Sequence, residues 1–214
     1  MNRISLIRHG RPAANLTSRI TGNGFEEWLR DYDKAGIDAS LPPPSALLQS
    51  LSNCALVLTS PAARAVESTA MLGLSVHSEV CADAIEAPLP TRIFWPLPTR
   101  PTMLTAVARI SWLLGVGRAK ESKKDVRYRA QKLANLLSSR AADCGHVALV
   151  THGYLIRFLR PVLEHSGWRR SAGRSFGYWS CAHFDRAQSA TDGNQSAVYF
   201  ASIPEPHDPL SVTK

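Results

Sequence analysis

Two short apolar runs in this chain end in the same way, and this repetition constrains the fold more than any other feature. Ile4–Ile7 leads directly into Arg8-His9-Gly10, and Val147–Val150 leads into Thr151-His152-Gly153. Apolar runs of this length predict buried strands. In an open α/β sheet, ligands bind at the carboxyl ends of the strands, where the chain turns toward the next helix. We therefore expect both histidines and Arg8 to meet at one edge of a sheet.

Strand-like runs alternate with helical patterns along the chain, and this alternation predicts an α/β fold with a largely parallel sheet. The segments expected to be strands are Ile4–Ile7, Ala55–Leu58, Val147–Val150, Tyr178–Phe184 and Ala197–Ile203. The last two are separated by the turn-rich sequence Asp192-Gly193-Asn194. They are therefore candidates for a hairpin at one edge of the sheet.

Helical signals occur in several places between these runs. Apolar residues recur with helical spacing in Asp125–Arg140, and again in Leu155–Leu163 after the second His-Gly corner. Pro161 interrupts the latter pattern and predicts a kink or a short helix. Ser60-Pro61 predicts the start of another helix, because serine is a good N-cap and proline fits the first helical position. Glu26–Tyr32 is compatible with a further helix.

Composition narrows the class of protein. The 214 residues are expected to form one domain, residues 1–214, and 25 Lys and Arg against 17 Asp and Glu give a net charge of +8 that favours anionic partners. The densest basic cluster, residues 120–129, is interpreted as a solvated helix face. Nucleic acid is not an expected partner, because the chain has neither a basic motif interleaved with aromatic residues nor a zinc module.

The sequence also favours a cytoplasmic protein without a membrane partner. No leader sequence precedes the first predicted strand, and no apolar stretch is long enough to cross a bilayer. The four cysteines are too far apart for the close pairs of a structural zinc site, and we expect them to be reduced. Neither a metal nor another cofactor is predicted.

A proline-rich segment, Glu86–Pro101, is expected to form an extended surface loop or lid that begins near residue 84. It contains the sequence Pro-Leu-Pro-Thr-Arg twice. Two interpretations remain open. The repeat is either a local duplication without chemical meaning, or a means of bringing Arg92, Trp95 and Arg100 to a substrate.

Arg64 belongs to the first turn of the helix predicted after Ser60-Pro61, where the helix dipole disfavours a cation. A bound anion would reverse this effect, because helix N-termini attract phosphate and a guanidinium suits phosphoryl oxygens. Two arginines and two histidines together suit phosphoryl transfer, since fixed cations stabilise the equatorial oxygens while a nucleophile attacks in line. A neutral imidazole can be that nucleophile without any metal.

Three motifs, in order along the chain, resemble those of the histidine phosphatase superfamily, the phosphoglycerate mutase-like proteins named for their Arg-His-Gly motif. The first is Ile4–Gly10, with Asn15 six residues after the histidine. The second is Leu58–Ala70, which contains Arg64, and the third is Leu149–Arg157. The resemblance covers most of the chain. It implies a three-layer sandwich with a largely parallel central sheet and helices on both faces.

The resemblance also implies roles for the motif residues. His9 would accept the phosphoryl group, while Arg8, Arg64 and the second catalytic histidine, His152, would hold it. Asn15 is a further expected contact to the phosphoryl group.

The family uses a carboxylic acid, placed after the second motif, to protonate the leaving oxygen. Glu86 is the best match in this sequence, and Asp83 is the alternative. The Gly-x-Trp-Glu-Gly type of continuation found in better-known members is replaced here by Ala87-Pro88-Leu89-Pro90.

The expected function is metal-independent hydrolysis of phosphomonoesters through a phosphohistidine on His9. The expected substrate is a small phosphorylated metabolite or a phosphoprotein. Two alternatives stay open: a phosphoglycerate-type mutase, and a catalytically inactive protein of the same fold that binds a phosphorylated ligand. The sequence does not predict the oligomeric state.

Overall fold

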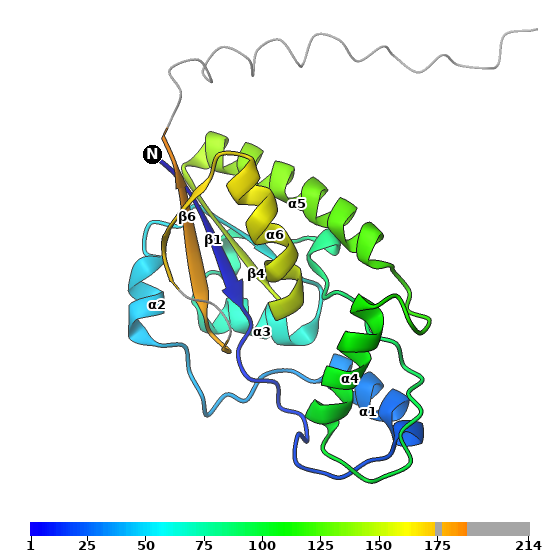
Figure 1. Ribbon diagram of the computed structural model, residues 1–214. Helices are drawn as coiled ribbons and strands as arrows, with labels where there is room; N and C mark the ends of the chain where they lie inside the picture. The colour runs from blue at the N-terminus through cyan, green and yellow to red at the C-terminus, as the bar shows by residue number, and fades with distance from the viewer. Residues whose placement is uncertain (174–176, 188–214) are drawn as a thin grey trace, which may run out of the picture.

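A six-stranded sheet forms the centre of the computed structural model, which describes residues 1–173 and 177–187 (Figure 1). In chain order its strands are β1 (Asn2–Arg8), β2 (Leu56–Thr59), β3 (Ser78–Val80), β4 (His146–Thr151), β5 (Arg169–Ala172) and β6 (Cys181–Arg186). They lie in the order β3-β2-β4-β1-β6-β5. The first four strands are parallel, and β6 is antiparallel to both β1 and β5. The predicted largely parallel sheet is confirmed.

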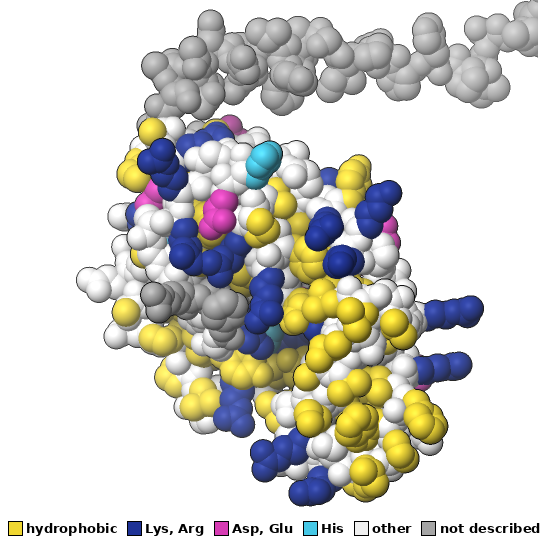
Figure 2. All heavy atoms as spheres, in the orientation of Figure 1, with side chains coloured by type: hydrophobic (Ala, Val, Ile, Leu, Met, Phe, Trp, Pro, Cys, Tyr) yellow, Lys and Arg dark blue, Asp and Glu magenta, His cyan; other side chains and the backbone are white. Residues whose placement is uncertain are grey.

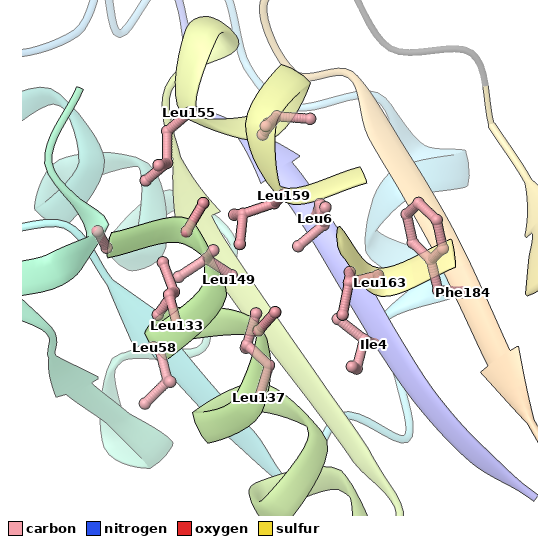
Figure 3. Close-up of a cluster of buried hydrophobic side chains, with 14 of the residues drawn as sticks. Ile4, Leu6, Leu58, Leu133, Leu137, Leu149, Leu155, Leu159, Leu163 and Phe184 are labelled. Atoms are coloured by element: carbon pink, nitrogen blue, oxygen red, sulfur yellow. The ribbon is translucent and has the colours of Figure 1, made fainter. Parts of the chain in front are cut away.

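Helices cover both faces of this sheet, as predicted. The α-helices are α1 (Phe25–Lys34), α2 (Ser45–Ser50), α3 (Ala63–Met71), α4 (Pro101–Leu113), α5 (Lys123–Cys144) and α6 (Gly153–His165), with 3-10 turns at η1 (Gly22–Gly24), η2 (Ser75–His77) and η3 (Ala82–Ala84). α5 and α6 pack on one face of the sheet (Figure 3). α2 and α3 pack on the opposite face.

The middle parts of β1 and β4 are mostly apolar, as expected for strands with both faces buried. Successive side chains of a strand point to opposite faces. Accordingly Leu6 belongs to the cluster with α5 and α6, whereas Ile7 belongs to the cluster with α2 and α3. Leu149 and Val150 divide in the same way. The unbroken apolar runs of the sequence therefore mark the centre of the sandwich.

The helices α5 and α6 follow their sequence patterns closely. α5 begins with a capping box, in which the Ser122 hydroxyl accepts from the Asp125 N–H and the Asp125 side chain accepts from the Ser122 N–H. Its predicted apolar face is buried at Val126 and Leu133. α6 continues through Pro161 to His165, so the expectation of a short helix is wrong. Proline removes one backbone donor, but the buried face of α6 still packs on the sheet.

A third apolar cluster joins α1 to α4 beyond the carboxyl end of β1 (Figure 1). Phe25, Leu104 and Ala108 are its fully buried members. The sequence predicted only the central part of α1, and it did not predict α4. Part of the proline-rich segment covers this pair, because Ile93 and Trp95 pack against the same cluster.

Two further expectations differ from the structure. The helix after β2 begins at Ala63, not at Ser60-Pro61, and the Ser60 hydroxyl does not cap it but forms a hydrogen bond with His152. The edge partner of β6 is β5, whose exposed polar residues give no alternating pattern. The predicted strand Ala197–Ile203 lies outside the described residues. None of the helices in the described ranges is both long enough and apolar enough to cross a bilayer.

Candidate active site

The carboxyl ends of three neighbouring strands meet at one cavity. β1 ends before His9, β2 ends before Ser60 and β4 ends before His152. Backbone hydrogen bonds align these ends, since the His9 N–H donates to the Thr151 carbonyl at 3.0 Å. The cavity has a volume of about 810 Å³, and its lining includes the predicted residues Arg8, His9, Arg64, Glu86 and His152.

His9 is buried with only 3% of its surface exposed. Its Nδ1 lies 2.7 Å from the Gly10 carbonyl oxygen. A carbonyl only accepts hydrogen bonds, so Nδ1 carries the proton and Nε2 carries the lone pair. Desolvation lowers the pKa of His9 to about 3. The charges of Arg64 and Arg8 lower it further, but each contributes less than burial does. The ring is therefore a neutral imidazole with its nucleophilic nitrogen defined.

His152 is the second buried histidine of the site. Its Nε2 lies 2.8 Å from the Ser60 hydroxyl, and its ring meets that of His9 edge-on with 5.0 Å between the centroids. Burial holds the pKa of His152 well below its usual range, and the charges of Arg64 and Arg8 act in the same direction. Its Nδ1 is buried and has no hydrogen-bond partner among the described residues. An anion in the cavity would be a suitable partner.

Arg64 comes from the first turn of α3, as predicted, and only 4% of it is exposed. Its guanidinium reaches the end of α1, where it lies 3.3 Å from the Tyr32 carbonyl oxygen and 3.4 Å from the Asp33 carboxylate. These distances exceed those of strong charge-assisted hydrogen bonds.

The Arg8 guanidinium lies 4.4 Å from the centre of the Tyr178 ring. On another side it passes the backbone of Gly153, where a Cβ atom would be in van der Waals contact with Nε of Arg8 at 3.4 Å. Together Arg8 and Arg64 place two cations beside two neutral histidines.

Glu86 comes from the segment after η3 and reaches the first turn of α6. Its carboxylate accepts hydrogen bonds from the N–H groups of Ala87 at 2.9 Å, Leu155 at 3.0 Å and Tyr154 at 3.2 Å. The acceptor oxygens satisfy backbone donors that a helix N-terminus leaves unpaired. Glu86 is thereby fixed next to His152, at the wall of the cavity.

Two buried arginines hold the main chain on either side of Glu86. Arg129 donates to the carbonyls of Asp83 at 2.8 Å and Ile85 at 2.7 Å. Arg109 donates to the carbonyls of Ala87 at 2.9 Å and, further along, of the following proline. Arg129 was expected on a solvated helix face, and this is wrong: it is 7% exposed because it turns inward to these carbonyls.

The structure does not bring Asn15 or Asp83 to the cavity. Asn15 is exposed, and its side-chain oxygen accepts from the N–H groups of Thr17 and Ser18 in a local turn. The Asp83 carboxylate forms an ion pair with Lys132 at 3.2 Å. Neither residue is among those that line the cavity. Of the two candidate acids, only Glu86 faces the histidines.

Several residues that line the cavity were not predicted from the sequence. The aromatic ones are Trp28 and Tyr32 of α1, Tyr154 of α6, and Tyr178. The four-residue spacing of the first pair on a helical segment was an available signal. Arg92, Trp95 and Arg100 do not line this cavity, although the segment before them contributes residues 85–89. Within the described ranges, no cluster of three or more His, Cys, Asp or Glu side chains has the arrangement of a metal site.

Comparison with known proteins gives evidence on the fold. No protein-family model matches the chain, and no curated protein sequence matches it significantly. Several solved structures do. A mycobacterial glucosyl-3-phosphoglycerate phosphatase in complex with VO3 has a TM-score of 0.55 and 22% identity over 86% of this chain and 92% of its own.

A phosphoserine phosphatase from Entamoeba histolytica has a TM-score of 0.52 and 16% identity, covering 88% of this chain and 98% of its own. The ecdysone phosphate phosphatase of Bombyx mori, in complex with tungstate, has a TM-score of 0.51 and 12% identity, covering 100% of this chain and 98% of its own. The chain therefore has the fold of the histidine phosphatase superfamily, and the phosphoglycerate mutase-like architecture implied by the three motifs is confirmed.

Proposed function

We propose that this protein is a phosphomonoester hydrolase in which His9 carries the phosphoryl group. The premise is the fold shared with known phosphatases, and one observation carries the proposal. The buried His9 ring is neutral, donates from Nδ1 to the Gly10 carbonyl, and keeps the lone pair on Nε2 in a cavity that also contains Arg8, Arg64 and His152. An activated nucleophile beside fixed cations is the combination that phosphoryl transfer needs.

In the first step, Nε2 of His9 attacks phosphorus from the side opposite the ester oxygen. A P–N bond forms while the P–O bond to the alcohol breaks, and Glu86 in its protonated form gives its proton to the leaving oxygen. Arg8 and Arg64 stabilise the charge on the equatorial oxygens, so the step requires no metal. His152 supplies a further hydrogen bond to the phosphoryl group through its buried ring nitrogen.

In the second step, water attacks phosphorus on the side that the alcohol has left. Glu86, now a carboxylate, accepts a proton from this water. The P–N bond breaks, its electron pair returns to Nε2 of His9, and inorganic phosphate leaves. The proposed substrates are small phosphorylated metabolites or phosphoproteins. Small metabolites are supported by the names of the solved structures, which include a phosphoserine phosphatase and a glucosyl-3-phosphoglycerate phosphatase.

A second candidate function has one observation in its favour. All the hydrogen bonds of the Glu86 carboxylate go to backbone N–H groups, which is also how a purely structural helix cap behaves. In that case the protein would bind a phosphorylated ligand without hydrolysing it. No structural observation favours the mutase alternative.

Turnover of aryl and alkyl phosphates, measured with a chelator present, separates these functions. We expect His9→Ala to abolish hydrolysis of both esters. Glu86→Gln should slow the alkyl ester by about 10²-fold or more, and the aryl ester much less, because a good leaving group needs little protonation. Asp83→Asn is the control and should retain wild-type turnover.

The results distinguish the two candidates directly. Hydrolysis that survives in His9→Ala would refute the phosphohistidine mechanism. A wild-type protein without turnover, whose melting temperature is nevertheless raised by orthovanadate, would establish the binding function instead. Rapid quenching at alkaline pH followed by mass spectrometry should detect a phosphate adduct on His9.

A further inference from the structure

The phosphate end accounts for only part of the cavity. Away from the two histidines, its walls are formed by α1, α4 and the segment 85–89. The residues that these elements contribute are mostly apolar or aromatic: Trp28, Leu29, Tyr32, Ile85, Pro88, Leu89, Ala106 and Ile110. Ligand sites in proteins typically have volumes of about 300–1,000 Å³. A cavity of about 810 Å³ therefore has room for much more than a phosphate group.

These apolar walls are held in place by a packed core of their own. The buried side chains of Phe25 and Leu104 join α1 to α4. The rings of Trp28 and Tyr32 stack with 5.1 Å between their centroids, and the indole N–H of Trp28 donates to the Asn15 carbonyl at 2.8 Å. The polar atom of Trp28 is thus satisfied, and its ring contributes apolar surface to the cavity.

Arg109 and Arg157 also line the cavity, and the guanidiniums of both lie over the Tyr154 ring, that of Arg157 with 4.9 Å to the centroid. Arg109 donates to two backbone carbonyls, and its guanidinium covers the Tyr154 ring with 3.9 Å to the centroid. The acidic side chain of Asp33 also lines the cavity, near the end of α1. A second anionic group on the substrate would meet this carboxylate and two arginines that already pack on an aromatic ring.

The apolar lining continues to the molecular surface along α4. Ile110 of this helix lines the cavity and is also 57% exposed. Figure 2 shows hydrophobic atoms gathered over the part of the molecule where α1 and α4 lie. A long apolar group could therefore extend from the cavity past Ile110.

We propose that the preferred substrates are phosphomonoesters of bulky apolar alcohols, with the apolar group lying between α1 and α4. This inference rests on the proposed function for the position of the phosphate group. Burial of apolar surface supplies the selectivity, since each buried methylene group strengthens binding several-fold. Esters of small polar alcohols would leave this surface unused.

Binding of alkylphosphonates tests the inference without requiring turnover. We expect octylphosphonate to bind at least about tenfold more tightly than ethylphosphonate, measured by calorimetry. Inorganic phosphate should compete with both ligands. Ile110→Gln should weaken octylphosphonate by about threefold or more and leave ethylphosphonate nearly unchanged. Met103→Gln is the matched control, because it removes an equally exposed apolar side chain from α4 outside the cavity, and it should change neither affinity.

Equal affinities for the two phosphonates would overturn the inference. So would octylphosphonate binding that phosphate does not compete for, or that Met103→Gln weakens as much as Ile110→Gln. Hydrolysis of ethyl and octyl phosphate is measured in parallel to test the proposed function separately. Phosphonate selectivity without hydrolysis would refute the enzymatic function but support the ligand class. His9-dependent hydrolysis with no preference for the octyl ester would support the enzymatic function but refute the proposed substrate class.

Discussion

At the scale of single residues, the site depends on His9 being both buried and correctly oriented. The Gly10 carbonyl fixes the proton on Nδ1, so the proposed attack by Nε2 would not require a change of tautomer. Burial disfavours the imidazolium and keeps the lone pair available at acidic pH. Burial therefore contributes more than Arg64 and Arg8 to keeping His9 neutral, and in the proposed reaction these arginines would chiefly bind the substrate anion.

The protonation state of His9 can be measured directly. Its pKa is lowered to about 3, so the ring should remain neutral while the pH falls from 8 to 5. Its side-chain NMR signal, assigned by comparison with His9→Gln, should show no titration in this range. A midpoint near the ordinary histidine value of about 6.5 would show that the ring is solvated and would contradict the described burial.

The neighbouring glycine leads to a second prediction at this scale. A Cβ atom on Gly10 would lie 2.5 Å from Cζ2 of Trp179, whose indole N–H is held by the Leu41 carbonyl at 2.9 Å. Gly10→Ala should therefore lower the free energy of unfolding by about 1–3 kcal/mol, measured by denaturant titration. Gly24→Ala is the control, because its Cβ would meet only an ordinary contact at 3.7 Å. Equal stabilities of the two variants would argue against the tight contact with Trp179.

At the scale of elements, the segment after η3 and the helix α6 are joined by Glu86. Its carboxylate accepts from the Tyr154 and Leu155 N–H groups, and the main chain beside it is held by Arg129 and Arg109. The candidate acid is thus part of the structure that caps the N-terminus of α6. The position of the Glu86 carboxylate is fixed both by its own hydrogen bonds and by the arginines that hold the neighbouring main chain.

This dual role predicts a stability effect that is separate from activity. Glu86→Ala removes the acceptor of the first turn of α6 and should lower the free energy of unfolding by about 1 kcal/mol, the usual cost of losing an N-cap. Glu86→Gln retains one acceptor oxygen and should cost less. Chemical denaturation of both variants provides the measurement. If Glu86→Ala is as stable as the wild type, the capping contacts are not significant in solution.

At the scale of the whole molecule, several histidines are buried in neutral form. Besides the active-site pair, His146 and His183 lie within 2.8 Å of the Ser5 hydroxyl between β4, β1 and β6. Desolvation lowers the pKa of His146 to about 4, and it also lowers that of His183. Folding is therefore linked to the neutral form of these imidazole rings.

The linkage predicts how stability depends on pH. Between about pH 6.5 and pH 4, the unfolded chain binds protons on these histidines while the folded protein does not. The free energy of unfolding should be highest above pH 6.5 and should fall as the pH decreases through this window. His146→Gln should flatten this dependence, as measured by thermal unfolding at several pH values. An unchanged slope would show that His146 does not contribute.

The sequence by itself determined the sandwich and the two His-Gly corners. Apolar runs such as Ile4–Ile7 and the pattern of α5 are local signals, and chain direction fixes which end of a strand meets the ligand. His9, His152 and Arg64 follow from these local patterns together with the family resemblance. The three residues line one cavity because each follows the carboxyl end of a strand, and these strands, β1, β4 and β2, are neighbours in the sheet.

Only the tertiary structure decided what surrounds those groups. Glu86 contacts Leu155 across 69 residues, and Arg129 contacts Ile85 across 44, and no local periodicity encodes contacts between such distant segments. The packing of α1 against α4 likewise depends on apolar residues far apart in the chain. Local chemistry therefore placed the proposed nucleophile and the proposed phosphate-binding groups, whereas long-range packing placed the candidate acid and shaped the rest of the cavity.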